Sequence, residues 1–178
     1  MSGDTEAVAA ADAPAETFDF DNIFRTHYRR IARVIVRVIQ DPSRAEELAV
    51  EVFWKLWRHP RAHGPQCSGW LYRSAVRIAV DELRTRARRE KYERWLGVDR
   101  SSDDPERSQE AAEERTKIRT VLATLRSQDA QLIALRAEGL SYEELAEALN
   151  LKATSIGTML RRAQESFRQE YIKRYGDA

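Results

Sequence analysis

The sequence has little of what membrane, secreted and metal-cluster proteins require. It contains one cysteine, Cys67, among 178 residues, which excludes an internal disulfide and a zinc site built from several cysteines. No apolar run is long enough to cross a bilayer. The first residues, MSGDTEAVAAADAPAE, lack the basic start and the apolar centre of a secretory signal. We therefore expect a cytoplasmic protein without membrane insertion.

Residues that could carry catalysis or hold a cofactor are also few. His59 and His63 are four residues apart, but Pro60 and Gly64 keep them off one regular helix face. No nearby cysteine or pair of acids completes a metal site. His27 stands alone in an amphipathic pattern, and neither a phosphate-cradling glycine loop nor a nucleophile motif occurs. We expect no cofactor and no enzymatic activity.

The net charge of +1 hides a segregation of charge along the chain. Residues 1–22 carry −6, residues 23–96 carry +9, residues 97–116 carry −4 and residues 117–178 carry +2. Two basic blocks separated by an acidic one suggest two modules that meet a polyanion. Arginines scattered over solvated helix faces would give the same counts, so this alternative stays open.

Apolar residues recur at helical spacing, and no segment sustains the period of two that a half-buried strand needs. The sequence therefore predicts an all-α protein of two small helical domains joined by a flexible acidic linker. The predicted parts are a disordered acidic tail at 1–17, a first domain at 18–96, the linker at 97–112 and a second domain at 113–178.

The first domain is predicted to contain three helices, at about residues 20–39, 43–58 and 68–97. Ser43, with Glu46 three residues on, is expected to cap the second helix with a capping box. The third begins near Ser68 or Gly69. The segment between the second and third helices, HPRAHGPQCSG, contains two prolines and two glycines and is predicted to be a loop.

The second domain is predicted to begin its first helix near Gln109. Ser127 is expected to cap the next helix, and Gly139 to end it in the left-handed region. Ser141 and Glu144 form a capping box before the short helical pattern EELAEAL.

Residues 140–163, LSYEELAEALNLKATSIGTMLRRA, are typical of a helix-turn-helix. Asn150 suits the positive φ of the turn, and Thr154 or Ser155 is expected to cap a last helix that runs to about Tyr171. The exposed face of that helix presents hydroxyls and guanidinium groups that reach base edges and phosphates in a major groove. The candidate residues are Ser155, Thr158, Arg161 and Arg162. A plain trihelical core can mimic this motif.

A second candidate nucleic-acid surface lies on the third helix of the first domain. Its end, LRTRARREKYER, is dense in bases that would neutralise phosphates. Upstream, aromatic and guanidinium planes beside a cationic surface suit unstacked single-stranded bases. The candidates are Trp70, Arg73, Arg77, Arg84 and Arg88. Trp70 is equally well explained as a core residue.

The second helix carries the pattern of a protein interface. Glu47, Val50, Glu51 and Trp54 recur at i, i+3, i+4 and i+7, so they share one face. The other side is apolar and is expected to face the core. An aromatic anchor with a polar rim suits a protein partner. The alternative is a helix buried on both sides.

Three segments in this order resemble a bacterial sigma-70-type factor of the extracytoplasmic-function group, from about Phe20 to Phe167. AEELAVEVFWKLWR is similar to the segment that docks on the clamp helices of the largest subunit of RNA polymerase. WLYRSAVRIAVDELRTRARR is similar to the segment that reads and melts the minus-ten element. LIALRAEGLSYEELAEALNLKATSIGTMLRRAQESF is similar to the domain that reads the minus-thirty-five element.

The resemblance implies roles for individual residues. Glu47 and Glu51 match acidic residues that dock on the polymerase. Trp70, Asp81 and Arg84 match a recurrent frame of the minus-ten segment.

In the last helix, Thr158, Arg161 and Arg162 match positions that meet the minus-thirty-five major groove. Two departures bear on promoter preference. Arg77 stands where an asparagine is usual near the flipped minus-ten base, and Gly157 removes a side chain that often touches DNA. Arg77 then either favours another base or contacts a phosphate.

The resemblance implies three partners. These are core RNA polymerase, contacted at the clamp helices of the largest subunit and at the flap, promoter DNA, and an anti-sigma protein that holds the factor inactive. The main alternative is a stand-alone helix-turn-helix regulator whose first domain is a helical sensor. The strong positive charge of residues 23–96 speaks against a sensor, which has no need of it.

Overall fold

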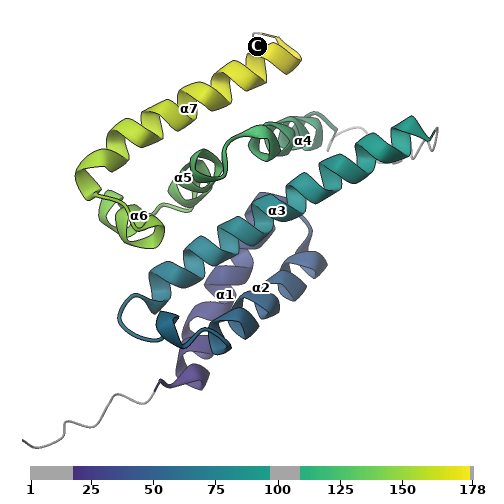
Figure 1. Cartoon of the computed structure of the whole chain (residues 1–178). Helices are drawn as coiled ribbons and strands as arrows, with labels where there is room; N and C mark the ends of the chain where they lie inside the picture. Colours follow the sequence, from purple (N-terminus) through teal and green to yellow (C-terminus); the bar gives the residue numbers. More distant parts are fainter. Residues whose placement is uncertain (1–17, 97–108, 177–178) are drawn as a thin grey trace, which may run out of the picture.

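The computed structural model describes residues 18–96 and 109–176, which contain α-helices, one 3-10 helix and no strand (Figure 1). The predicted all-α class is therefore confirmed. The helices are α1 (Phe20–Ile39), α2 (Pro42–Trp57), η1 (Pro60–Ala62), α3 (Cys67–Trp95), α4 (Gln109–Thr124), α5 (Ser127–Ala137), α6 (Tyr142–Leu149) and α7 (Ala153–Tyr175).

Two predicted segments fall wholly or mostly outside the described residues. The acidic tail at 1–17 lies outside them, as does the predicted linker up to residue 108. The last four residues of that linker, 109–112, are helical, because α4 begins at Gln109, where the first helix of the second domain is also predicted to begin. Glu110, Ala111 and Ala112 favour helix intrinsically, and this preference prevails over the acidic composition.

Helices α1, α2 and α3 form the N-terminal unit around an aliphatic and aromatic core. The apolar stripe of α1 is buried, as are Val52, Phe53 and Leu56 of α2. The ring of Phe53 meets Phe24 edge-on at 4.9 Å between centroids. Removing a fully buried phenylalanine side chain typically costs about 3–5 kcal/mol, so Phe53 is central to this unit.

Helices α4 to α7 form the C-terminal unit, with α6 and α7 as the helix-turn-helix. Ser141 caps α6 in the predicted capping box with Glu144, and Asn150 ends it with a φ of 54°. Gly139 has a φ of +88°, as its predicted stop position requires. Ile156 anchors α7 and is fully buried.

The predicted cap of α2 is wrong. Asp41 is the N-cap, and its Oδ1 accepts a hydrogen bond from the backbone N–H of Arg44 at 3.0 Å. Pro42 begins the helix, where a missing N–H costs nothing and the fixed φ is already helical. Ser43 and Glu46 therefore lie inside the helix and form no capping box.

Three other helix ends differ from prediction. Arg126, not Ser127, precedes α5, and the Ser127 hydroxyl instead accepts from Gln131 Nε2 at 2.9 Å. Helix α7 begins at Ala153 without a side-chain cap, so neither Thr154 nor Ser155 caps it. It ends at Tyr175 rather than Tyr171. The Tyr171 hydroxyl bonds to Glu114 of α4 and its ring packs on Tyr175, which holds the extra turn in place.

Helix α3 is the element that both units share. It is 29 residues long, starts one residue before the predicted position, and lies between α1 and α2 on one side and the C-terminal unit on the other (Figure 1). Buried side chains from both units join in one apolar cluster. The packing of α3 against α4, α5 and α6 decides which of its residues face solvent.

Candidate polymerase and nucleic-acid interfaces

The outer face of α2 is an exposed apolar patch with acidic neighbours. Val50 is 53% exposed and Trp54 is 55% exposed, while Glu47 and Glu51 beside them are also exposed. The opposite side of the helix, including Phe53, is buried. Because the outer face is exposed, the alternative of a helix buried on both sides is wrong. Large apolar side chains kept in water on one helix face are typical of a binding surface.

Local contacts hold this face in shape without covering it. Glu47 accepts from Arg44 Nη1 at 2.6 Å, and Glu51 pairs with Lys55 Nζ at 2.7 Å. The guanidinium carbon of Arg58 lies 4.6 Å from the centroid of the Trp54 ring. Exposed ion pairs are worth at most about 1 kcal/mol each, so a partner can exchange them at little cost.

Sequence reasoning missed one member of this patch, Trp57, which is 59% exposed. It lies next to Phe20 of α1, with a ring-centroid distance of 5.1 Å. The signal was present, because Val50, Trp54 and Trp57 stand at i, i+4 and i+7. The apolar patch is therefore longer than predicted and reaches α1.

The predicted minus-thirty-five residues lie near the start of α7. Thr158, Arg161 and Arg162 are exposed, and Ser155 is half-buried. Residues on the opposite side of α7 are buried against the rest of the unit: Ile156, Leu160 and Ala163. A short supporting helix with a second helix that presents hydroxyl and guanidinium groups is the arrangement that enters a major groove.

The predicted minus-ten residues on α3 differ in their exposure to solvent and in their contacts. Arg77 and Arg88 are exposed. Trp70 is half-buried and stacks on His59, with centroids 6.0 Å apart and an interplanar angle of 19°. Trp70 is therefore neither a fully buried core residue nor a freely exposed ring.

Arg73 and Arg84 are engaged with the C-terminal unit. Arg73 Nη1 donates to the carbonyl oxygen of Ala148 at 2.9 Å. Arg84 donates through Nε to the Ala123 carbonyl at 3.3 Å and through Nη2 to the Leu125 carbonyl at 2.9 Å. Sequence reasoning could not find these contacts, because the acceptors are backbone atoms far along the chain.

The basic end of α3 is not uniformly available to a polyanion. Arg86 bonds to Glu82 at 3.0 Å and to Asp41 at 2.9 Å, and Glu82 also accepts from Arg44 at 3.2 Å. The backbone N–H of Arg44 and the guanidinium of Arg86 lower the pKa of Asp41. Burial alone would raise the pKa of Glu82, but the hydrogen bonds from Arg44 and Arg86 outweigh it and lower the pKa. Arg86 thus links α3 to Asp41, the N-cap residue of α2.

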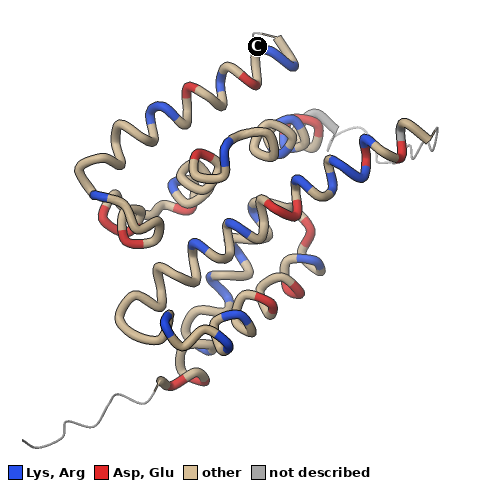
Figure 2. The backbone as a smooth tube through the Cα atoms, viewed as in Figure 1, with Lys and Arg blue, Asp and Glu red and all other residues tan. Residues whose placement is uncertain are grey.

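Figure 2 shows the charge pattern along the backbone: Lys and Arg positions recur along α1 and α3, and Asp and Glu positions recur on α2 and in the α5–α6 region. Opposite charges therefore face each other where α1 meets the α5–α6 turn. Arg37 Nη1 bonds there to Glu138 Oε2 at 3.2 Å.

The histidines and the cysteine have structural surroundings. His63 Nε2 lies 2.9 Å from the Leu56 carbonyl, and its ring stacks on Phe18 at 3.5 Å between centroids. Cys67 is buried, and burial raises the pKa of its thiol. Within residues 18–96 and 109–176, no group of three or more His, Cys, Asp or Glu side chains could hold a metal ion. None of the described helices combines the length and the hydropathy that a bilayer span requires.

Comparison with known families matches both units. The family profile described as Sigma-70 region 2 matches residues 23–89, and the one described as Sigma-70, region 4 matches residues 115–165. Both matches fall on the segments that carried the resemblance in the sequence. The two matches together place a sigma-70 region 2 before a sigma-70 region 4 in one chain, and this pair of regions defines the class of protein.

Curated relatives and a solved structure agree with these matches. The ECF RNA polymerase sigma factor SigE of Mycolicibacterium smegmatis is 26% identical over 96% of this chain and 73% of its own length. The ECF RNA polymerase sigma factor SigK of Mycolicibacterium vanbaalenii is 28% identical over 86% of this chain and 80% of its own length. The sigma factor RpoE, solved in complex with the anti-sigma factor NepR from Bartonella quintana, shares the fold with a TM-score of 0.50 and 21% identity, over 87% of this chain and 97% of that chain. This chain belongs to the sigma-70 family of RNA polymerase sigma factors, in its extracytoplasmic-function group.

Proposed function

We propose that this chain binds core RNA polymerase and directs it to promoters, acting as an initiation factor and not as an enzyme. The observation that carries the proposal is the pairing of two sigma regions, each with its own exposed surface, in one chain. Residues 18–96 would be sigma domain 2 and residues 113–178 sigma domain 4. A stand-alone regulator with a sensor module has no need of the first region.

The outer face of α2 would bind the clamp helices of the largest polymerase subunit. Val50, Trp54 and Trp57 supply the apolar centre, and Glu47 and Glu51 supply the acidic rim. Interfaces typically place aromatic anchors at the centre and polar groups around them. The C-terminal unit would contact the flap, which positions α7 over the upstream element.

The two DNA elements would be read in different ways. Thr158, Arg161 and Arg162 would meet the minus-thirty-five element as duplex, with Ser155 at the edge of the contact. The unstacked minus-ten strand would be bound by five residues of α3: Trp70, Arg73, Arg77, Arg84 and Arg88. Selective affinity for the separated strand shifts the duplex–bubble equilibrium, so melting needs no nucleotide hydrolysis.

Attachment to polymerase would make two weak DNA contacts act together. Each unit alone has a small contact surface, and tethering converts the second contact into an intramolecular one. Free protein would then bind promoter DNA weakly, and the complex with polymerase would bind it in a salt-sensitive way.

An anti-sigma protein would be the third partner, since the solved relative RpoE is bound by the anti-sigma factor NepR. We place this activity in the cytoplasm, where polymerase and promoters are.

Transcription by purified core polymerase on a library of genomic fragments tests the proposal. With the added chain, a defined subset of start sites should give transcripts, and omission of the chain is the control. Transcripts that do not depend on the chain, or tight sequence-specific DNA binding by the chain without polymerase, would contradict it and favour the stand-alone regulator.

A further inference from the structure

We infer that the C-terminal end of α3 is a further contact for an unpaired DNA strand, in which two exposed rings stack on bases and two cations bind phosphates. These four residues are Arg88, Lys91, Tyr92 and Trp95. The α3 tip is defined here as residues 88–96. The inference extends the proposed function past Arg88, the last α3 residue assigned to the minus-ten strand. The region 2 profile ends at residue 89, so both rings lie outside the matched segment.

The α3 tip carries the most exposed large apolar residue among the described ones. Trp95 is 79% exposed, and Tyr92 beside it is 60% exposed. Their ring centroids are 6.1 Å apart, and the ring planes are inclined at 32°. Figure 1 shows that the end of α3 extends past the ends of α2 and α4, so neighbouring helices do not cover the rings. Two large rings held in water are unfavourable in a free protein and are typical of a binding surface.

Basic and acidic residues of the α3 tip lie on different faces of the helix. Arg88 and Lys91 are exposed, and they stand seven and four residues before Trp95, so the three share one face. The acids are engaged elsewhere: Glu93 pairs with an arginine of the preceding turn at 2.9 Å, and Glu90 lines a cavity between α3 and α4. Within the α3 tip, the face of Trp95 therefore holds cations and no acid.

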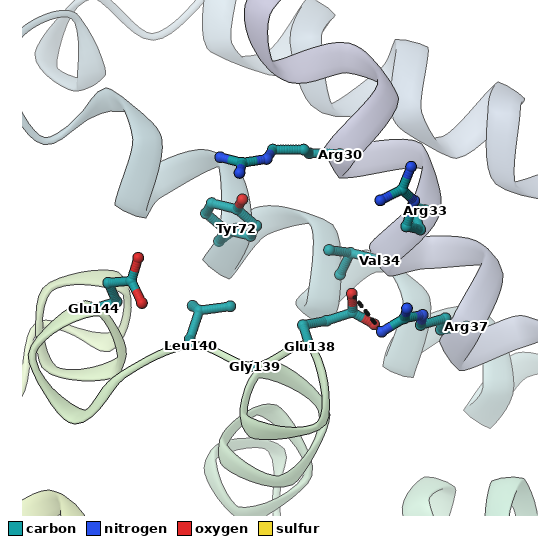
Figure 3. Close-up of a pocket in the computed structure, with 9 residues that line it drawn as sticks. All are labelled: Arg30, Arg33, Val34, Arg37, Tyr72, Glu138, Gly139, Leu140 and Glu144. Carbon is teal, nitrogen blue, oxygen red and sulfur yellow. Dashed lines mark hydrogen bonds and ion pairs between the residues drawn. The ribbon is translucent and has the colours of Figure 1, made fainter.

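Both cations are available to bind phosphates. Arg88 donates to the neutral hydroxyl of Thr85 at 3.2 Å, and no ion pair of Lys91 is present among the described residues. Arg37 of α1 is a contrasting case, because it already pairs with Glu138 at 3.2 Å beside a cavity (Figure 3). A guanidinium held by a carboxylate must give up that pair to bind a phosphate, whereas Arg88 and Lys91 have no such pair to break.

The face of the minus-ten candidates continues along α3 to the tip. Eighteen residues separate Arg77 from Trp95 and make about five full turns of an α-helix, so the two side chains point in the same direction. The same spacing relates Trp70 to Arg88. At a rise of about 1.5 Å per residue, Trp70 and Trp95 are about 37 Å apart along the helix axis. A strand that follows this face from Trp70 therefore meets a second aromatic site after the cations.

The sign of the charge around the rings selects the occupant. The other exposed aromatic patch, on α2, has an acidic rim formed by Glu47 and Glu51 and is assigned to polymerase. The α3 tip has a basic rim, which complements phosphates. Ring faces stack on unpaired bases, whereas the bases of a duplex are already stacked on one another. An unpaired DNA strand is therefore the occupant that uses both the rings and the charges.

Binding of fluorescein-labelled oligothymidylate by the full chain at low salt, without polymerase, tests the inference. Trp95→Ala should weaken binding at least about fivefold, which is the lower end of what one base stacked on a ring contributes. Trp95→Phe retains a ring and should keep most of the affinity. Leu96→Ala is the matched control and should bind like the unaltered chain, because Leu96 is adjacent and 52% exposed but has no ring.

The salt dependence of binding separates the rings from the cations. Lys91→Ala should reduce the slope of log K against log salt by about 0.7, which corresponds to one phosphate contact on a single strand. Trp95→Ala should leave this slope unchanged, because a ring releases no counterions. An equal fall of the slope in both variants would contradict stacking.

Three results would overturn the inference. They are the absence of oligothymidylate binding by the full chain, equal affinity of Trp95→Ala and the unaltered chain, and an equal loss for Trp95→Ala on a duplex with the same number of phosphates. A chain that shows the predicted Trp95 effect but does not bind core polymerase would support the inference and remove the proposed function. The two can therefore fail separately.

Discussion

Replacing Trp54 by alanine should weaken polymerase binding about a hundredfold without weakening the fold. A tryptophan side chain buries roughly 150–250 Å². Because Trp54 is 55% exposed in the free chain, on the order of 110 Å² remains for a partner to cover. At about 25 cal/mol per Å² of apolar area, docking gains about 3 kcal/mol from this one ring, which corresponds to about a hundredfold in Kd.

The fold should tolerate the change because the ring contributes little to the core. Exposed substitutions away from caps and buried networks usually change the free energy of unfolding by less than about 0.5 kcal/mol. Urea unfolding of Trp54→Ala should therefore follow that of the unaltered chain. The loss measured in binding then belongs to the interface and not to the stability of the N-terminal unit.

The assay is a titration of fluorescently labelled chain with core polymerase, read by anisotropy. Trp95→Ala is the matched control, since Trp95 is 79% exposed but lies at the far end of α3. Equal Kd values for Trp54→Ala and the unaltered chain, or an equal loss in Trp95→Ala, would refute the assignment of the α2 face to polymerase.

Three further predictions follow from individual residues. Arg161→Ala should weaken binding of the polymerase complex to an upstream duplex and reduce the salt slope of log K by about 1, measured by titration at several salt concentrations. Asn150→Val should cost about 1–2 kcal/mol in urea unfolding, because a β-branched residue is strained at a φ of 54°, whereas Asn150→Gly should be near neutral. The pKa of Asp41 is lowered in the folded state, so its carboxylate stabilises the fold above the ordinary value of 3.8 and loses this effect as pH falls through the lower folded value. Asp41→Asn should therefore show a smaller loss of stability below about pH 4, with the cap retained, in unfolding experiments across pH.

The features that were predicted correctly from the sequence depend on the spacing of residues close together in the chain. The alternation of buried and exposed residues on α2 and the turn at Asn150 follow from helical periodicity and backbone preference, and the structure has both. The capping box at Ser141 also depends only on residues three apart. The cap at Asp41 was missed because a second local rule, proline in the first turn, outranks the serine that follows.

What could not be predicted depends on contacts between distant backbone atoms. Arg84 and Arg88 look alike in the sequence, one helical turn apart in a basic run. In the structure Arg84 caps α4 while Arg88 bonds only to the neighbouring Thr85 hydroxyl, among the contacts of the described residues. No sequence pattern marks a carbonyl oxygen as an acceptor for a side chain some 40 residues away. The availability of each minus-ten candidate is therefore a property of the tertiary packing.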